Sequence, residues 1–133
     1  MLNNEIDKIK DALAKDKEIL FAYLFGSRTN GMVSERSDWD IAVYLTDNTE
    51  PMPSKAFYIE AVLARLLRTD DVQIIILNNL DAPLLGFEII KNNMLLVDKD
   101  EEGRIEFEAR ILNQYHDWQY FSKRHMDAEG WAV

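Results

Sequence analysis

Cysteine is absent from this sequence of 133 residues, and positive charge is scarce in it, with 15 Lys and Arg against 24 Asp and Glu. The first absence excludes disulfide bonds and metal sites built on thiolates. The second leaves a net charge of −9 and argues against direct binding to nucleic acid, which needs a basic face to displace counterions. No apolar run is long enough to span a bilayer, and no basic segment leads into an apolar one as in a signal peptide. We therefore expect a soluble, cytoplasmic protein that has no membrane partner.

A hydrophobic fraction of 47% is enough to fill the core of one compact domain at this length. Apolar runs alternate along the chain with amphipathic helical patterns, which is typical of an α/β protein with a mixed sheet flanked by helices. We predict a single domain over residues 1–133, with its core in residues 1–98 and a C-terminal helical tail over residues 101–127. The predicted strands cover residues 19–25, 39–45, 72–77 and 94–97. The predicted helices cover residues 3–15, residues 53 or 54 to 68, residues 81–92 and the tail.

Local signals predict where the helices start and which sides they bury. Asn3 or Asn4 is expected to cap the first helix, and Asp81 the third. The inner side of the second helix is expected to consist of five apolar residues: Phe57, Ala61, Leu63, Ala64 and Leu67. Along the tail, one stripe holds an acid among apolar and aromatic residues: Ile105, Glu108, Ile111, Leu112, Tyr115 and Trp118. The aromatic residues of the tail allow two interpretations, a helix packed across the domain or a surface that binds a partner.

The segment from Gly26 to Asp40 reads GSRTNGMVSERSDWD, a Gly-Ser pair followed after ten residues by Asp-x-Asp. Because side chains alternate along a strand, Asp38 and Asp40 should face the same way, with Cα atoms roughly 7 Å apart. Two adjacent carboxylates repel each other unless a cation lies between them. Hard oxygen ligands at this spacing suit Mg²⁺, which also takes phosphate oxygens. The pair therefore predicts a metal site of the kind that assists phosphoryl displacement.

The Gly-Ser pair comes at the end of an apolar strand and is expected to begin a helical turn. Gly26 would let backbone N–H groups approach a phosphate, and the Ser27 hydroxyl would donate to it. Arg28 and Arg36 are the nearby cations that could neutralise a triphosphate. Alone, a Gly-Ser pair is a common turn and an Asp-x-Asp a solvated edge; their combination at this spacing, flanked by strands, indicates a nucleotide site.

This segment resembles the Gly-Ser-x10-Asp-x-Asp signature of the DNA polymerase β-like nucleotidyltransferase superfamily. The short chain, the segment over residues 78–90 and the helical tail resemble its minimal nucleotidyltransferase (MNT) branch. The resemblance implies the nucleotidyltransferase fold, with Gly26 and Ser27 on the triphosphate of ATP and with Asp38 and Asp40 on Mg²⁺. It also implies an antitoxin that forms a hetero-oligomer with a cognate HEPN ribonuclease toxin. Such an antitoxin transfers AMP from ATP to a tyrosine of the toxin and thereby neutralises it.

Two departures from this family stand out. A third carboxylate commonly lies on the neighbouring strand, where this chain has Gln73, which cannot act as a base. Asp71 could replace it, or could belong to a turn with Asp70. One arginine fewer follows the Gly-Ser pair. These departures leave two alternative functions open: a weak or inactive MNT that neutralises its partner by binding alone, and nucleotidyl transfer to a small molecule.

Overall fold

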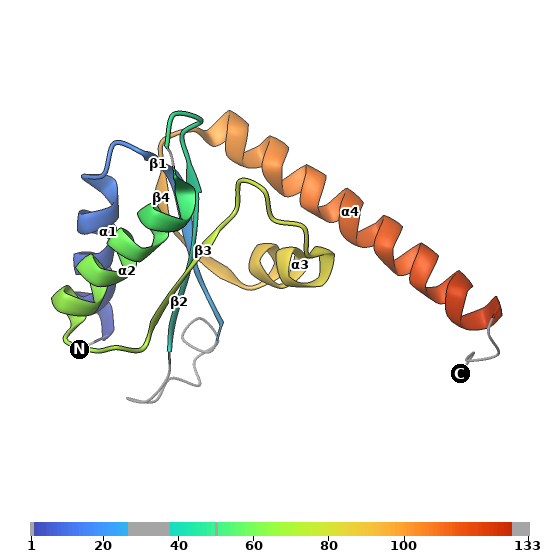
Figure 1. Cartoon of the computed structure of the whole chain (residues 1–133), viewed down its shortest axis with the longest axis horizontal. Helices are drawn as coiled ribbons and strands as arrows, with labels where there is room; N and C mark the ends of the chain where they lie inside the picture. Colours follow the sequence, from blue (N-terminus) through green and yellow to red (C-terminus); the bar gives the residue numbers. More distant parts are fainter. Residues whose placement is uncertain (1, 27–37, 50, 129–133) are drawn as a thin grey trace.

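The computed structural model describes residues 2–26, 38–49 and 51–128, which form a four-stranded sheet between two pairs of helices (Figure 1). The predicted α/β class is confirmed. The elements in chain order are α1 (Leu2–Ala14), β1 (Ile19–Phe25), β2 (Trp39–Leu45), α2 (Met52–Leu67), β3 (Val72–Ile76), α3 (Pro83–Lys91), β4 (Asn93–Asp98) and α4 (Glu101–Ala128). Among the described residues, no helix is both long and apolar enough to cross a membrane.

The sheet is mixed, as the sequence predicts, with strand order β3-β2-β1-β4. The central strand β1 runs antiparallel to β2 and to β4, whereas β2 and β3 are parallel. Six of the seven residues of β1 and five of the seven of β2 are buried, because both strands have neighbours on each edge and helices on each face. The two strands that flank the Gly-Ser-x10-Asp-x-Asp segment therefore form the rigid centre of the molecule.

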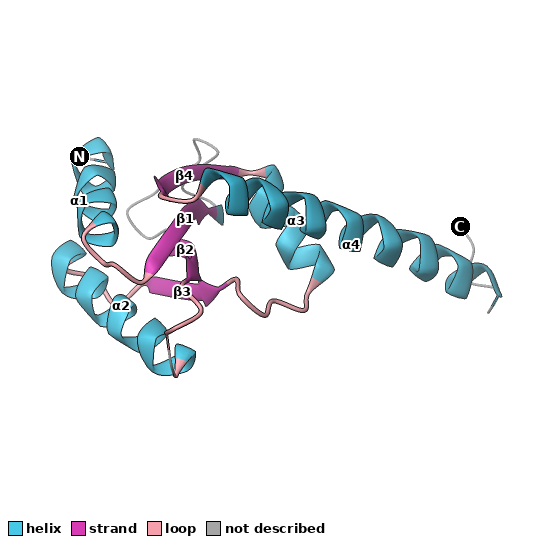
Figure 2. Cartoon of the chain, turned by 90° about the horizontal axis from the view of Figure 1, so that it is seen from above, coloured by secondary structure: helices cyan, strands magenta, loops and turns pink. Residues whose placement is uncertain are grey.

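One face of the sheet is covered by α1 and α2, as the view from above shows (Figure 2). Alternation along β2 directs Trp39, Ile41 and Val43 to this face, where all three are buried. They belong to one apolar cluster with buried residues of the two helices: Ile6, Ile9, Leu13, Ile59 and Leu63.

The opposite face of the sheet is covered by α3 and by the first half of α4 (Figures 1 and 2). Here Phe21, Tyr23 and Ala42 of the strands form a second cluster with Ile89, Phe107 and Ile111 of the helices. Because Asp40 and Ala42 are two residues apart in β2, Asp40 shares this second face.

A side chain continues the pairing of β2 where β3 ends. β3 stops at Ile76, one residue before the predicted end, although the Leu77 amide still donates to the Val43 carbonyl at 2.9 Å. The Asn78 side chain then accepts from the Leu45 amide at 2.8 Å and donates to the Leu45 carbonyl at 2.7 Å. This pair of hydrogen bonds holds the segment after β3 against the end of β2.

The predicted helix caps are wrong. α1 begins at Leu2, so Asn3 and Asn4 lie inside the helix and neither is its N-cap. The N-cap of α3 is Ala82 and not Asp81, and it forms no side-chain cap hydrogen bond. Pro83 follows it at the first helical position, where its fixed φ and its missing N–H suit a helix start and reduce the need for a cap.

The predicted inner side of α2 is confirmed for Leu63, which is buried, and for Ala64 and Leu67, which pack against the core. It is wrong for Phe57, which is 73% exposed, and for Ala61, which is also exposed, whereas Ile59 is buried. The helix begins at Met52, with Pro53 within its first two residues, rather than at residue 53 or 54. Apolar residues occur around most of this helix, so the sequence pattern alone does not select the buried stripe.

The predicted tail helix is confirmed, and it extends beyond the rest of the molecule. α4 spans 28 residues, and Figure 1 shows its second half running away from the sheet towards the C-terminus. Only the first half packs across the domain, through the buried residues Phe107 and Ile111.

Candidate active site

Asp40 lies in the second position of β2, between the end of β1 and the start of β3. Its Cα partner is Phe25 in β1 and Gln73 in β3. The side chain is half-buried, and Asp38, just before the strand, is exposed. Burial, and secondarily the charge of Asp38, raise the pKa of the Asp40 carboxyl above its usual value. The structure thus brings the two predicted carboxylates together, at an electrostatic cost to the folded chain.

Gly26 lies directly against the Asp40 carboxylate. Its φ of 83° is in the left-handed region, and a Cβ placed on it would lie 2.5 Å from Asp40 Oδ2. A side chain here would therefore be strained and would overlap the carboxylate, so glycine is needed for two separate reasons. The antiparallel pairing of β1 with β2 causes this approach, because it brings Phe25 beside Asp40. The other predicted phosphate-binding residues, Ser27, Arg28 and Arg36, lie outside the described residues.

The position of the expected third acid is occupied by an amide. Gln73 is the register partner of Asp40 in a parallel pair, so their side chains lie next to each other on one face. Asp71 continues this pairing, because its carbonyl accepts from the Trp39 amide at 2.8 Å. Its own amide donates to the Thr69 hydroxyl at 3.1 Å, so Asp71 also ends the turn after α2. The carboxyl of Asp71 is exposed, on the side of the sheet that Asp38 occupies.

The part of the chain that the structure describes contains no group of three or more His, Cys, Asp or Glu able to hold a metal ion by itself. The donor set at the start of β2 is therefore two carboxylates. This is the number that Mg²⁺ commonly takes from a protein when a nucleotide supplies further oxygens.

Two residues near this site were missed by sequence reasoning. Asn93 is the partner of Phe25 on the other edge of β1. Its side-chain amide donates to the carbonyls of Ile89 and Ile90 at 2.9 and 3.0 Å, which joins the end of α3 to the sheet. Tyr23, two residues before Phe25, donates a hydrogen bond of 2.7 Å to Glu108. The acid within the apolar stripe of the tail was the only available signal for this contact.

Residues 7–102, more than half of the chain, match the family described as Polymerase beta, Nucleotidyltransferase. The chain belongs to this family. The match includes Gly26, Asp38 and Asp40, so the resemblance seen in the sequence is confirmed for the segment that carries the Gly-Ser and Asp-x-Asp pairs.

A curated relative of this nucleotidyltransferase is the protein adenylyltransferase MntA of Aphanizomenon flos-aquae. The two sequences are 27% identical over 111 residues, which cover 75% of this chain and 71% of the relative.

Two solved structures have the same fold. One is described as a tri-AMPylated Shewanella oneidensis HEPN toxin in complex with MNT antitoxin, and the matching chain has a TM-score of 0.73 and 21% identity. The match covers 96% of this nucleotidyltransferase and 98% of that chain. The other is a toxin–antitoxin complex with AMP-PNP, with a TM-score of 0.71, 22% identity and coverage of 94% and 95%. The predicted nucleotidyltransferase fold is therefore confirmed.

Proposed function

We propose that this nucleotidyltransferase is an MNT antitoxin that transfers AMP from ATP to a tyrosine hydroxyl of a cognate HEPN toxin and so neutralises it. The observation that carries the proposal is the contact between Gly26 and the Asp40 carboxylate, at the junction of β1 and β2. This contact supports the proposal, because nucleotidyl transfer requires backbone that can approach a phosphate beside a carboxylate that can bind a metal ion. The names of the relative and of the two solved complexes support the choice of AMP and of a HEPN partner.

Asp38 and Asp40 are the proposed ligands of Mg²⁺. The raised pKa of Asp40 reflects lost hydration and the repulsion of Asp38, and a divalent cation between the two carboxylates would relieve both. When bound, Mg²⁺ supplies charge neutralisation at the phosphates and makes the acceptor oxygen more acidic. The proposed reaction belongs in the cytoplasm, because Mg²⁺ and ATP are both abundant in that compartment.

We assign binding of the triphosphate to Gly26 and to three residues that follow it in the sequence. Gly26 lets the backbone approach the phosphates, Ser27 donates from its hydroxyl, and Arg28 and Arg36 neutralise charge. In the reaction the tyrosine oxygen forms a bond to the α-phosphorus, and the bond from that phosphorus to the pyrophosphate breaks. The phenol proton leaves at the same time, and we assign its acceptance to Asp71, an exposed carboxylate next to the start of β3 whose carbonyl pairs with Trp39.

A second candidate function is neutralisation by binding alone. It is favoured by the position of Gln73, whose amide stands beside Asp40 where a third carboxylate would complete the acid cluster. An amide neither accepts the proton nor binds a hard cation as well as a carboxylate does. This alternative predicts that the toxin is inhibited without ATP.

The deciding experiment measures transfer of radiolabelled AMP from ATP and Mg²⁺ to the purified HEPN protein. Asp38→Ala combined with Asp40→Ala should lower the labelling rate by at least about 100-fold, because both metal ligands are lost. Asp47→Ala is the matched control, since Asp47 is an exposed carboxylate after the far end of β2. Full labelling by the double variant would refute the proposed mechanism. Full inhibition of the toxin by that variant, without ATP, would establish the second candidate instead.

A further inference from the structure

The surroundings of α4 change abruptly at Tyr115. Before this residue the helix is held by the buried side chains Phe107 and Ile111. At Tyr115 itself, the phenol ring stacks on Phe87 of α3 with ring centroids 3.8 Å apart. After it, none of residues 116–126 is buried. We call residues 116–126 the arm; Figure 1 shows it projecting past α3.

The arm carries large apolar side chains that are exposed to solvent. Trp118 is 41% exposed, Tyr120 58%, Phe121 66% and Met126 43%. Trp118 lies two helical turns after Ile111, so it continues the stripe by which α4 packs on the sheet, and Phe121 follows one turn later. The apolar stripe of α4 thus continues into the arm, where no other part of the described chain covers it. Exposed apolar surface of this kind marks an interaction site.

The arm lies on the catalytic side of the sheet. Asp40 shares its sheet face with Ala42, and Ala42 belongs to the apolar cluster that contains Phe107 and Ile111 of α4. A macromolecule that delivers a hydroxyl to Asp40 therefore approaches the sheet face on which α4 is anchored.

The arm also differs in charge from the rest of the chain. Residues 101–115 contain four acidic and two basic residues, whereas residues 116–126 contain Lys123 and Arg124 against Asp117 alone. Arg124 donates to the Tyr120 hydroxyl at 3.1 Å and lies over its ring, so this charge is held beside the exposed aromatics. Within a chain of net charge −9, the arm thus suits a partner surface that is apolar and edged by Asp or Glu.

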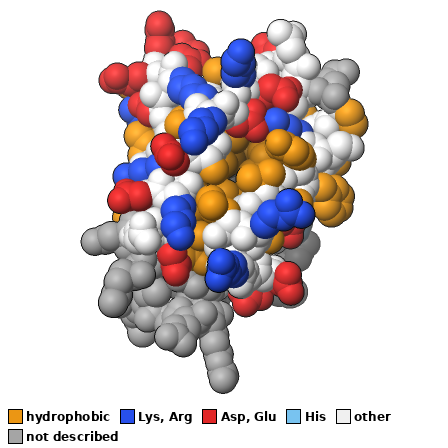
Figure 3. Space-filling model, turned by 90° about the vertical axis from the view of Figure 1, so that its left-hand side faces the viewer, with side chains coloured by type: hydrophobic (Ala, Val, Ile, Leu, Met, Phe, Trp, Pro, Cys, Tyr) orange, Lys and Arg blue, Asp and Glu red, His pale blue; other side chains and the backbone are white. Residues whose placement is uncertain are grey.

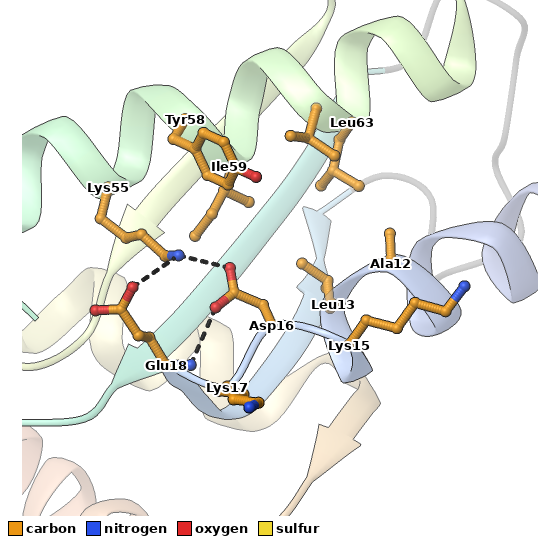
Figure 4. A pocket seen from close by; sticks show the side chains of 11 residues that line it. Ala12, Leu13, Lys15, Asp16, Lys17, Glu18, Lys55, Tyr58, Ile59 and Leu63 are labelled. Atoms are coloured by element: carbon orange, nitrogen blue, oxygen red, sulfur yellow. Dashed lines mark hydrogen bonds and ion pairs between the residues drawn. The ribbon is translucent and has the colours of Figure 1, made fainter.

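The hollow between α1 and α2 is a weaker candidate for the same role. Figure 3 shows hydrophobic side chains gathered on this face, and the hollow measures about 400 Å³. Both of its carboxylates are already paired within it, because Lys55 contacts Asp16 at 2.7 Å and Glu18 at 3.1 Å (Figure 4). It also lies on the sheet face opposite to Asp40.

We propose that the arm is the docking surface for the protein acceptor, with Trp118 and Phe121 as its anchors and Lys123 and Arg124 as its charged end. The acceptor would contribute an apolar patch edged by acidic residues. This inference rests on the proposed function, in which a HEPN protein supplies the acceptor tyrosine. Docking through the arm would hold that protein beside the catalytic face while its tyrosine reacts.

The test compares two double variants. The arm variant combines Trp118→Ser and Phe121→Ser, and the control variant combines Phe57→Ser and Tyr58→Ser. The control removes two aromatics of similar exposure, 73% and 60%, from α2 on the opposite side of the sheet. The affinity for the cognate HEPN protein, with its ribonuclease residues inactivated, is measured by calorimetry. The arm variant should bind at least about tenfold more weakly, since aromatic anchors dominate interface energies. The control should bind within about twofold of the wild type.

The affinity for AMP-PNP and the helical circular dichroism should be unchanged in both variants. Equal affinity of the arm variant and the wild type for the HEPN protein would overturn the inference. Loss of self-association by the arm variant, with unchanged HEPN affinity, would assign the arm to a second copy of this chain and would also overturn it. Failure of the wild type to bind the HEPN protein would overturn both proposals. Weaker docking of the arm variant, together with no AMP transfer by the wild type, would uphold the docking surface and refute the proposed reaction.

Discussion

At the scale of single residues, the site is a compromise between function and stability. Gly26 and Asp40 are in contact, and Asp40 is half-buried beside the exposed Asp38. The folded chain therefore holds a carboxylate where ionisation is disfavoured, as expected when the site is built for a cation that arrives with the nucleotide. Gln73, the register partner of Asp40, avoids a third negative charge in this cluster.

Asp40→Asn should stabilise the chain at neutral pH in the absence of divalent cations. Because the folded-state pKa of Asp40 is raised above its ordinary value of 3.8, the folded state holds this proton more tightly than the unfolded chain does. Ionisation of Asp40 therefore costs stability above the folded-state pKa, and the cost disappears as the pH falls below the ordinary value. Urea unfolding should show Asp40→Asn more stable by a few tenths to about 1 kcal/mol at pH 7, since solvent screens the half-exposed pair.

This difference between wild type and variant should close as the pH falls below 3.8, where Asp40 becomes protonated in both states. Asp47→Asn, at an exposed position after the other end of β2, is the control and should show no such closing. A wild type more stable than Asp40→Asn at pH 7 without metal would contradict this account.

At the scale of elements, α4 is fastened to the centre of the sheet by a polar link. Tyr23 of β1 donates to Glu108 at 2.7 Å, and Arg104 joins Glu108 to Asp98 at the end of β4. Burial and the neighbouring Glu108 raise the pKa of the Tyr23 phenol strongly. The strand that leads to Gly26 and the helix that leads to the arm are therefore directly connected.

Tyr23→Phe should lower the free energy of unfolding by about 1–2 kcal/mol at pH 7, because a hydrogen bond to a charged, half-buried acceptor is lost. Since the folded-state pKa of Tyr23 is raised, this contribution is complete below the ordinary value of 10.0 and declines as the pH rises above it. The stability gap between wild type and Tyr23→Phe, followed by urea unfolding, should thus narrow above pH 10.

Tyr120→Phe provides the comparison for this measurement. The Tyr120 hydroxyl also has a partner, Arg124, but it lies in the exposed arm. Its removal should change stability by less than about 0.5 kcal/mol. Equal effects of the two substitutions would show that the Tyr23 link contributes nothing beyond a surface contact.

At the scale of the whole molecule, the two faces of the sheet differ in what they carry. α1 and α2 close one face with apolar packing, whereas the other face combines the anchoring of α4 with the catalytic end of β2. The arm extends from this second face without a buried residue of its own. The buried core and the proposed docking surface therefore lie in separate parts of the chain.

Removal of residues 117–133 should leave the fold intact, since within residues 101–126 the buried anchors of α4 precede Tyr115, whose ring stacks on Phe87. We expect the free energy of unfolding to change by no more than about 1 kcal/mol and the affinity for AMP-PNP to stay within about twofold. Urea unfolding and calorimetry with the nucleotide check the two expectations. A truncated chain that fails to fold cooperatively would show that the arm contributes to the core.

Strand positions could be predicted from the sequence because the strands are apolar runs bounded by breaks in that pattern. β1 and β2 match their predicted bounds, and β3 ends one residue earlier than expected. The starts of the helices and their buried sides were harder to predict from the sequence. The caps of α1 and α3 were wrong. The buried side of α2 includes the predicted Leu63 but takes Ile59 instead of Phe57 and Ala61, because packing against the sheet, rather than local pattern, selects the stripe.

The sequence alone was sufficient to indicate the site of this protein: its carboxylate pair, its Gly-Ser pair and their spacing between two apolar strands pointed to a nucleotide and a metal ion, and their resemblance to a known signature pointed to a nucleotidyltransferase. Only the tertiary structure decided which groups meet. The antiparallel register of β1 and β2 brings Gly26 against Asp40, and the parallel register of β3 places Gln73 beside Asp40. Because α4 runs on past α3, Trp118 and Phe121 are left exposed. The physical reason is that residue types and their spacing are local properties of a chain, whereas contacts across the sheet depend on how the helices share its two faces.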